Sequence, residues 1–318
     1  MQTELLFPDY INEELIAIPE YTLQRMDTVS GRHYMVRPKD SDGEFLLPSI
    51  TTIVRSTSPL SPFIINKMIE MGKEKWDEYL YERMEYGTNL HILIGEFVRR
   101  KSMNLPLTQE DIDDIGMHNR GFNLTIFNRF KDDYYSDLIA FAQFYFDYKI
   151  EPIALEIPLA SVKEGFAGTL DMPCKMQVPT KGFWGEVYKT GPNKGNMKET
   201  TQDVEVIGLV DFKSGRHGFY RENEVQLKMC EVLFRENFPK FSDSAPIKLY
   251  NWSPKSWIKE PGYNLTDQTD KVTNDNYMSR VKLFRSEFDN SFKSKRVIFG
   301  TLELGTEPIE MYVNETIF

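Results

Sequence analysis

The stretch VIGLVDFKSG, at residues 206–215, limits the possible folds of this chain more than any other part of the sequence. Four of its first five residues are apolar, which is typical of a strand that is buried on both faces of a sheet. Asp211 and Lys213 lie two positions apart, so on a strand their side chains share one face and Phe212 points to the other. The stretch therefore predicts a central strand that ends with a carboxylate beside an ammonium group, with Phe212 in the core.

The first half of the chain is predicted to be a hairpin followed by helices. Residues 32–38 and 44–54 have strand-like patterns around the turn sequence KDSDG. Ser61 before a proline is a typical helix start, and the apolar spacing stays helical up to Gly87, which we expect to separate two helices. A long aromatic-rich helix is expected at about residues 124–148.

The second half has a different texture, because short apolar runs after Pro152 predict three strands, a helix, a fourth strand and a last helix. Residues 179–203 are expected to form a long exposed hairpin or loop. The sequence thus predicts an α/β fold, with a mixed central sheet flanked by helices and a helical N-terminal portion. We expect residues 1–150, the hairpin and helical portion, to pack on a core of residues 151–318 as one compact unit.

An Asp-x-Lys tripeptide is a weak motif by itself, and the chain has two, at residues 147–149 and 211–213. Only the second lies on a predicted strand, where its two charged residues share a face. Asp171 closes the preceding predicted strand, GFAGTLD. If these two strands are neighbours that end at one edge of the sheet, Asp171 and Asp211 come within reach of one divalent ion.

Two more segments extend the pattern: GTNLH places His91 on a helix after a glycine, and EVQLK places Gln226 on the helix after the strand. In the order GTNLH, GTLD, VDFKSG and EVQLK, the chain resembles the PD-(D/E)xK nuclease superfamily, in its RecB-like and phage exonuclease branch. The similarity covers about residues 48–253 and includes the phrase LPSITTIV. It implies a restriction-endonuclease-like mixed sheet flanked by helices.

The chain departs from this family in two respects. Related nucleases often carry a tyrosine one helical turn after the glutamine, where this chain has Cys230, although Tyr220 lies close enough in sequence to substitute for it. Some relatives also hold a four-cysteine iron–sulfur cluster, which a chain with two cysteines cannot build.

The resemblance implies a role for each matching residue. Lys213 would orient or help deprotonate the attacking water, and Gln226 would position Lys213 or the substrate backbone. Glu156, in ALEIPLA, matches an acidic strand residue of the family and would support the metal ligands from behind. The implied ligands are two carboxylates, one imidazole and one main-chain carbonyl: Asp171, Asp211, His91 and the carbonyl of Phe212.

This set of groups suits phosphodiester hydrolysis. Carboxylate oxygens bind Mg²⁺ or Mn²⁺, which neutralise phosphate charge and lower the pKa of bound water, and the imidazole favours Mn²⁺ slightly. Simpler interpretations stay open: Asp211 with Lys213 as a solvated ion pair worth about 0–1 kcal/mol, His91 as a core histidine, and Gln226 as a helix-surface residue.

The net charge of −10 argues weakly against nucleic acid as a partner. Basic residues near the motif nevertheless define a candidate DNA-binding patch, with a solvated loop as the alternative interpretation. The patch comprises Lys181, Lys189, Lys194, Lys198, Arg216 and Arg221.

Other features of the sequence favour an intracellular protein. There is no apolar run long enough to cross a membrane, and the N-terminus is acidic where a signal peptide would be basic. Two cysteines fit a reducing compartment. We therefore expect a cytoplasmic location, which is the host cytoplasm if a phage encodes the chain.

The sequence as a whole favours a Mg²⁺- or Mn²⁺-dependent deoxyribonuclease that acts in DNA recombination, repair or replication. An exonuclease is preferred by family analogy only. The expected partners are DNA and either a second copy of the chain or a recombination protein. Two alternatives remain: a non-catalytic nucleic-acid-binding protein that retains the nuclease fold, and an unrelated metal hydrolase that uses the same residues.

Overall fold

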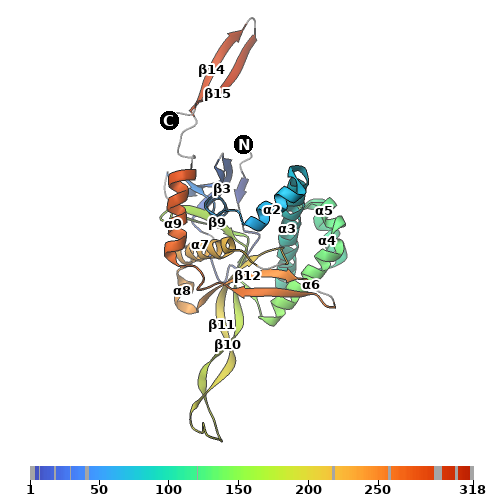
Figure 1. Cartoon of the computed structure of the whole chain (residues 1–318), viewed down its shortest axis with the longest axis vertical. Coiled ribbons are helices and arrows are strands. Elements are labelled where there is room, and N and C mark those ends of the chain that lie inside the picture. The colour runs from blue at the N-terminus through green and yellow to red at the C-terminus, as the bar shows by residue number, and fades with distance from the viewer. Residues whose placement is uncertain are drawn as a thin grey trace.

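The structure is a computed structural model, and it shows a mixed α/β protein whose central sheet is flanked by helices (Figure 1). None of the helices in the described part of the chain is long and apolar enough to cross a membrane. The described residues are 4–6, 8–17, 19–28, 30–39, 43–119, 121–216, 219–256, 259–289, 296–304 and 307–315.

The central sheet has five strands, and β11 lies in its middle. The long strands β10 and β11 pair antiparallel, whereas β11 and β12 pair parallel, so the sheet is mixed as expected. The strand order across the sheet is β13 (Gly262–Asp267), β12 (Ile247–Lys255), β11 (Met197–Phe212), β10 (Met172–Val187) and β6 (Glu151–Pro152).

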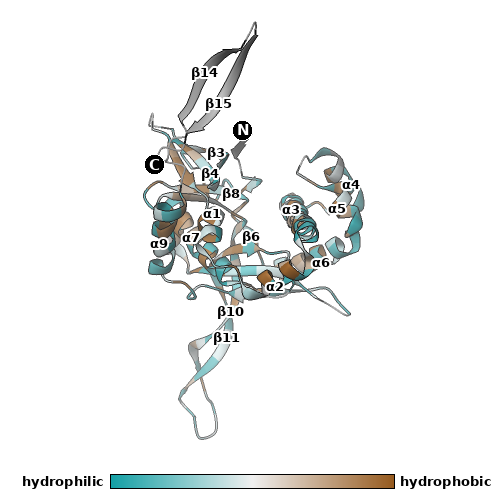
Figure 2. Ribbon diagram, turned by 45° about the horizontal axis from the view of Figure 1, so that its top comes forward, coloured by the Kyte–Doolittle hydropathy of each residue, from teal (hydrophilic) through white to brown (hydrophobic). Residues whose placement is uncertain are grey.

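Each face of the sheet has its own hydrophobic cluster, and Figure 2 colours the strands and the helices around them by hydropathy. Ile207 and Leu209 of β11 pack towards α7 (Arg221–Asn237) on one face. Phe212 packs on the other face, with its ring about 5.5 Å from Phe141 of α6 (Lys131–Asp147). The predicted burial of Phe212 is therefore confirmed, and the period-2 pattern of the strand accounts for it.

The N-terminal hairpin is only half as predicted. Strands β4 (Gly31–Pro38) and β5 (Phe45–Pro48) pair, but Ile50–Thr57 is helix α1 and not the end of a strand. Its β-branched residues suggested a strand, but the Ser49 hydroxyl accepts a hydrogen bond from the Thr52 N–H at 3.0 Å and so caps a helix.

The break predicted at Gly87 is absent, because α3 (Lys73–Ser102) runs through it as one helix of 30 residues. A Cβ atom at Gly87 would lie 3.4 Å from the Ser214 hydroxyl. An added Cβ atom would therefore make an ordinary contact with the loop that follows β11, and the helix tolerates this glycine without requiring it. The expected helix at residues 124–148 is instead divided at Phe130 into α5 (Leu124–Arg129) and α6.

The remaining elements lie outside the central sheet, and β1 (Glu4–Leu6), β3 (Tyr21–Thr28), β4 and β5 form a second sheet of four strands. Helix α2 begins at Pro62 with Ser61 as its N-cap, as predicted. The other helices are α2 (Pro62–Met71), α4 (Gln109–His118), α8 (Lys240–Ser244), α9 (Asn274–Leu283) and the π-helix η1 (Phe284–Phe288). The other strands are β2 (Tyr10–Ile11), β7 (Ala154–Leu155), β8 (Ile157–Ser161) and β9 (Phe166–Leu170). Strands β14 (Arg296–Leu304) and β15 (Glu307–Glu315) pair with each other.

Candidate functional site

Asp171 and Asp211 lie close together at one end of the paired strands β10 and β11, here termed the sheet edge. The strand pairing that brings them together differs from the one expected from the sequence. Strand β9, which precedes Asp171, belongs to a separate two-stranded sheet with β8. Asp171 instead comes directly before β10, whose first residue, Met172, lies opposite Val210 of β11. The antiparallel ladder therefore places Asp171 beside the end of β11, where its Oδ2 accepts a hydrogen bond from the Phe212 N–H at 2.7 Å.

His91 reaches this edge from α3 and joins two carboxylates. Its Nδ1 lies 2.8 Å from Glu156 Oε1, and its Nε2 lies 4.0 Å from Asp171 Oδ2. The same Nε2 is 3.3 Å from the carbonyl oxygen of Phe212. One potential ligand atom each from His91, Glu156 and Asp171 lie within 4.8 Å of one another. Three of the predicted residues thus converge with a main-chain carbonyl.

Glu156 is part of this group because of its backbone. It lies between β7 and β8 with a φ of 47°, a left-handed conformation that costs about 1 kcal/mol or more for a residue other than glycine. Its N–H donates to the carbonyl of Asp171 at 2.9 Å. The chain therefore turns sharply at Glu156, and this turn directs its carboxylate to His91.

The electrostatic state of the group follows from burial and mutual attraction. Burial lowers the pKa of His91, but the charge of Asp171 and the hydrogen bond and charge of Glu156 outweigh it and raise the value to about 9. Burial raises the pKa of Asp171 above its ordinary value, although His91 opposes this. A nearby cation stabilises the ionised form of a buried carboxylate more than it stabilises that of an exposed one.

Asp211 lies on the opposite face of β11 from Phe212 and is almost fully buried, with 6% of its side chain exposed. The Lys213 ammonium donates to Oδ1 at 2.8 Å, and Gln226 of α7 donates to the same oxygen at 3.1 Å. Burial raises the pKa of Asp211 to about 6, against the lowering effect of Lys213. The pair of Asp211 and Lys213 is therefore not the solvated surface ion pair of the simpler interpretation.

Lys213 is held in place from both its backbone and its side chain. Its N–H donates to the carbonyl of Trp252 on β12 at 2.8 Å, and its ammonium lies 3.5 Å from Gln226 Oε1. Burial lowers the pKa of Lys213, but the charges of Asp211 and Asp171 outweigh it and raise the pKa above its ordinary value. The amine is thus protonated at neutral pH in this arrangement.

Cys230 stands on α7 below the two aspartates, where it shares the lining of a small cavity with Asp171 and Asp211. Burial and the two negative charges raise the pKa of its thiol well above the usual value, so it remains a neutral SH group. Tyr220, the suggested substitute for the family tyrosine, is 55% exposed at the N-terminus of α7.

Two residues of the predicted DNA-binding patch are engaged in other contacts. Arg216 lies 2.7 Å from the buried Asp137 of α6 and 3.4 Å from Asp133. Arg221 pairs with Glu224 and also donates to the carbonyl of Lys271. Arg216 therefore joins the loop after Lys213 to the helical layer, and its guanidinium is not free to contact a phosphate.

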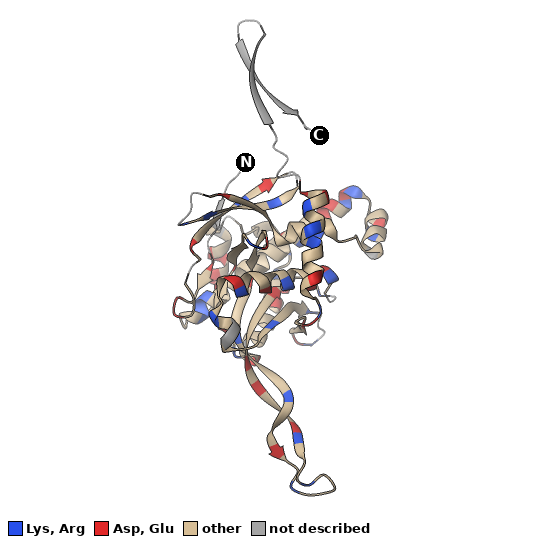
Figure 3. Ribbon diagram, turned by 90° about the vertical axis from the view of Figure 1, so that its left-hand side faces the viewer, with Lys and Arg blue, Asp and Glu red and all other residues tan. Residues whose placement is uncertain are grey.

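The lysines of the patch lie on an arm that points away from the site. Residues 179–203 form the hairpin that the sequence suggested, as the outer part of the β10–β11 ladder. From Met172 to Phe183, a ribbon of this length spans about 36 Å. Lys181, Lys189, Lys194 and Lys198 are exposed there, interspersed with Glu186, Glu199 and Asp203 (Figure 3). The arm is of mixed charge and does not concentrate cations at the sheet edge.

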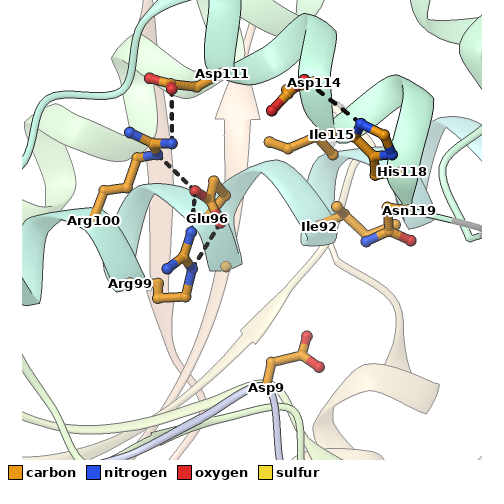
Figure 4. Close-up of a pocket in the computed structure, with 11 residues that line it drawn as sticks. Asp9, Ile92, Glu96, Arg99, Arg100, Asp111, Asp114, Ile115, His118 and Asn119 are labelled. Atoms are coloured by element: carbon orange, nitrogen blue, oxygen red, sulfur yellow. Dashed lines mark hydrogen bonds and ion pairs between the residues drawn. The ribbon is translucent and has the colours of Figure 1, made fainter.

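A larger pocket, of about 610 Å³, lies between α3 and α4, one helical turn beyond His91 (Figure 4). Its two arginines pair with acidic residues of the same lining: Arg99 and Arg100 with Glu96, and Arg100 also with Asp111; His118 lies 3.8 Å from Asp114. The lining carries four carboxylates, Asp9, Glu96, Asp111 and Asp114, against two arginines, so the pocket does not concentrate the positive charge that a phosphate would require.

Sequence reasoning missed two buried polar residues near Asp211. Asn251 on β12 donates to Asp211 Oδ2 at 2.7 Å, and Gln268 donates to Asn251 Oδ1 at 3.0 Å. The available signal was a polar residue within the apolar strand LYNW, since an asparagine is rarely fully buried without a partner.

The ion pair between Arg216 and Asp137 leads to a prediction about pH. Burial raises the pKa of Asp137 to about 6, despite a hydrogen bond from Tyr86 at 2.6 Å and the charge of Arg216. Between about pH 4 and pH 6 the folded protein therefore holds a proton that the unfolded chain has released, and this contribution to stability is lost as the pH rises.

An Asp137→Asn variant lacks this proton. The free energy of unfolding of the wild type, relative to that variant, is expected to increase by about 2 kcal/mol as the pH falls from about 7.5 to 4.5. Urea unfolding of both proteins across this range measures the difference. Parallel pH profiles for the two proteins would contradict the prediction.

The comparisons with known proteins add no family assignment. No family model matches the chain, and no curated protein matches it.

Proposed function

We propose that this protein is a nuclease with a restriction-endonuclease-like core that uses Mg²⁺ or Mn²⁺ to hydrolyse phosphodiester bonds in DNA. The observation that carries the proposal is the convergence at one sheet edge of His91, Glu156 and Asp171 with the buried pair of Asp211 and Lys213. Ordinary structural stability does not require so many ionisable groups in one partly buried position, because burial of each charge costs free energy.

The residues fit a hard divalent cation. Carboxylate oxygens are preferred ligands of Mg²⁺ and Mn²⁺, and a single imidazole favours Mn²⁺ slightly. Ligand atoms of His91, Glu156 and Asp171 are already gathered within 4.8 Å of one another, and Asp211 lies outside that group. His91, Asp171, Asp211 and the Phe212 carbonyl would hold the ion, and the bound ion would neutralise phosphate charge and make a water molecule more acidic. The hydrogen bond from His91 Nδ1 to Glu156 orients the imidazole, and Nε2 would be the ligand atom. Because the pKa of His91 is raised to about 9, Nε2 would release a proton when a metal binds.

Lys213 has an electrostatic role in this proposal. Since its pKa is raised, it carries a positive charge at neutral pH and cannot accept a proton from water in this state. Its ammonium lies at the mouth of the site, 26% exposed, where a scissile phosphate would meet it. Lys213 therefore stabilises the charge that develops on the phosphate, and Gln226 holds both Lys213 and Asp211 in place.

The biological setting is proposed on the family resemblance alone. The enzyme would be an exonuclease that acts on DNA ends in recombination, repair or replication, in the cytoplasm of the cell or of a phage host. Its partners would be DNA and a second copy of the chain or a recombination protein.

Incubation of linear DNA with the protein and Mg²⁺ or Mn²⁺, with and without EDTA, tests the activity. We expect cleavage that EDTA abolishes and that is lost in Asp211→Ala and Lys213→Ala proteins. A matched control is Lys149→Ala, from the other Asp-x-Lys tripeptide, whose side chain is 67% exposed. A closed circular substrate of the same sequence, which an exonuclease leaves intact, separates the two modes of cleavage. Equal activity of the wild type and both site variants would reject the assignment.

The second candidate is a DNA-binding protein without turnover. Cys230 in place of the family tyrosine favours it. DNA binding without cleavage, in either metal and across pH, would support this alternative. Hydrolysis of small phosphoesters in preference to DNA would instead indicate an unrelated metal hydrolase.

A further inference from the structure

Asn251 is the deepest polar contact of the candidate site. It lies on β12 directly opposite Asp211 in the parallel ladder, and its side chain has no solvent exposure. Its Nδ2 donates to Asp211 Oδ2 at 2.7 Å, on the side of the carboxylate away from Gln226, which donates to Oδ1. The two amides therefore hold different oxygens of the same carboxylate.

Gln268 fixes the orientation of the Asn251 amide. It follows β13, is 4% exposed, and its N–H donates to the carbonyl of Leu249 at 2.8 Å. Its Nε2 donates to Asn251 Oδ1 at 3.0 Å. Because a donor occupies the oxygen of Asn251, the NH₂ group of Asn251 must face Asp211, and a flipped amide would lose both hydrogen bonds.

The hydrogen bonds from Gln268 to Asn251 and from Asn251 to Asp211 form a relay. Burying these side chains costs free energy of folding unless every hydrogen-bond partner is present. Burying an amide without a hydrogen bond costs about 1–3 kcal/mol, and apolar side chains of similar size would fill the same space without that risk. We propose that Asn251 and Gln268 are positioning residues, which hold Asp211 Oδ2 while Gln226 and Lys213 contact Oδ1, and so fix the plane of the carboxylate at the candidate site. This inference rests on the proposed function and deepens it, since it names what aims the Asp211 carboxylate at the cation.

The variant Gln268→Glu tests the relay with almost no change in shape. A glutamate carboxylate cannot donate to Asn251 Oδ1, and instead accepts from Asn251 Nδ2, so the asparagine would turn its oxygen to Asp211. Changes in such outer hydrogen bonds typically weaken metal affinity by about 10- to 100-fold. We expect that loss for Gln268→Glu and a comparable loss for Asn251→Leu, which removes the contact to Asp211 altogether.

The measurement is a titration of each full-length protein with Mn²⁺ in the absence of DNA, in which electron paramagnetic resonance reports free Mn²⁺. Circular dichroism establishes whether each variant is folded. If the Asn251→Leu protein is not folded, the Gln268→Glu protein alone tests the proposal. Asn264→Asp is the matched control, because Asn264 lies on β13 and donates to Ser253 at 3.4 Å without contact to Asp211. Its Mn²⁺ affinity is expected to stay within about twofold of the wild type.

The kinetics distinguish a positioning role from a structural one. In saturating Mn²⁺, the Gln268→Glu protein is expected to recover most of its kcat with an unchanged KM for DNA, because excess metal compensates for weaker binding. Wild-type Mn²⁺ affinity in a folded Gln268→Glu protein would overturn the relay and leave the proposed function intact. Failure of the wild type itself to bind Mn²⁺ would reject the proposed function, and the relay with it.

Discussion

An Asp171→Asn protein is expected to be more stable than the wild type and nearly inactive. Burial raises the pKa of Asp171, which means that its ionised carboxylate is unfavourable in the folded protein without a cation. The amide oxygen of asparagine still accepts the hydrogen bond from the Phe212 N–H, so the edge keeps its geometry. Removing the charge therefore relieves a cost in folding and removes a metal ligand at the same time.

The activity of this variant should fall by about a thousandfold, the equivalent of about 4 kcal/mol of lost charge stabilisation. Thermal unfolding is measured in EDTA, because bound metal stabilises the wild type and would hide the effect. The exposed Asp203→Asn on the β10–β11 arm is the control, and it should change neither quantity. A lower melting temperature than the wild type, or retained cleavage, would be inconsistent with a buried charged ligand at this position.

A Lys213→Met protein is expected to lose cleavage by about 100- to 1,000-fold while it binds Mn²⁺ at least as tightly as the wild type. The ammonium lies 2.7 Å from Asp211 Oδ2 and competes with a cation for that carboxylate. Without it, Asp211 loses its cationic partner in the metal-free protein, and His91 is the cation that remains beside Asp171. The variant should therefore be destabilised in EDTA and rescued by Mn²⁺.

Melting temperatures in EDTA and in Mn²⁺ measure this effect. The difference between the two conditions should be larger for Lys213→Met than for the wild type, whereas Lys149→Met should match the wild type. Loss of Mn²⁺ binding in the Lys213 variant would show that the lysine supports the metal ligands and does not act on the phosphate, contrary to the role proposed here.

The central strand could be predicted because its information is local. Alternation along residues 206–213 places Phe212 on one face and Asp211 with Lys213 on the other, and the structure has that arrangement. Helix α1 was mistaken for a strand because Ile50–Thr57 is rich in β-branched residues, whereas the cap formed by Ser49 decides its conformation. Gly87 was mistaken for a break, but a single glycine only weakens a helix, and α3 continues through it.

Other parts of the site depend on contacts that no local pattern records. The meeting of Asp171 with Asp211 was expected, but it results from the start of β10 and not from the end of β9. The position of Glu156 depends on one left-handed residue between two short strands. Asn251 faces Asp211 only because β12 pairs parallel to β11, and strand order is set by the whole fold. Arg216 was expected to contact DNA, but its partner Asp137 lies far away in the sequence.

The most direct test of a shared cation at this sheet edge is anomalous diffraction from a crystal soaked in Mn²⁺. The account predicts one manganese peak in contact with His91 Nε2, Asp171 and Asp211, and displacement of the Lys213 ammonium from the carboxylate that it contacts here. Manganese bound elsewhere, with Asp171 and Asp211 still held by Phe212 and Lys213 as they are now, would contradict it.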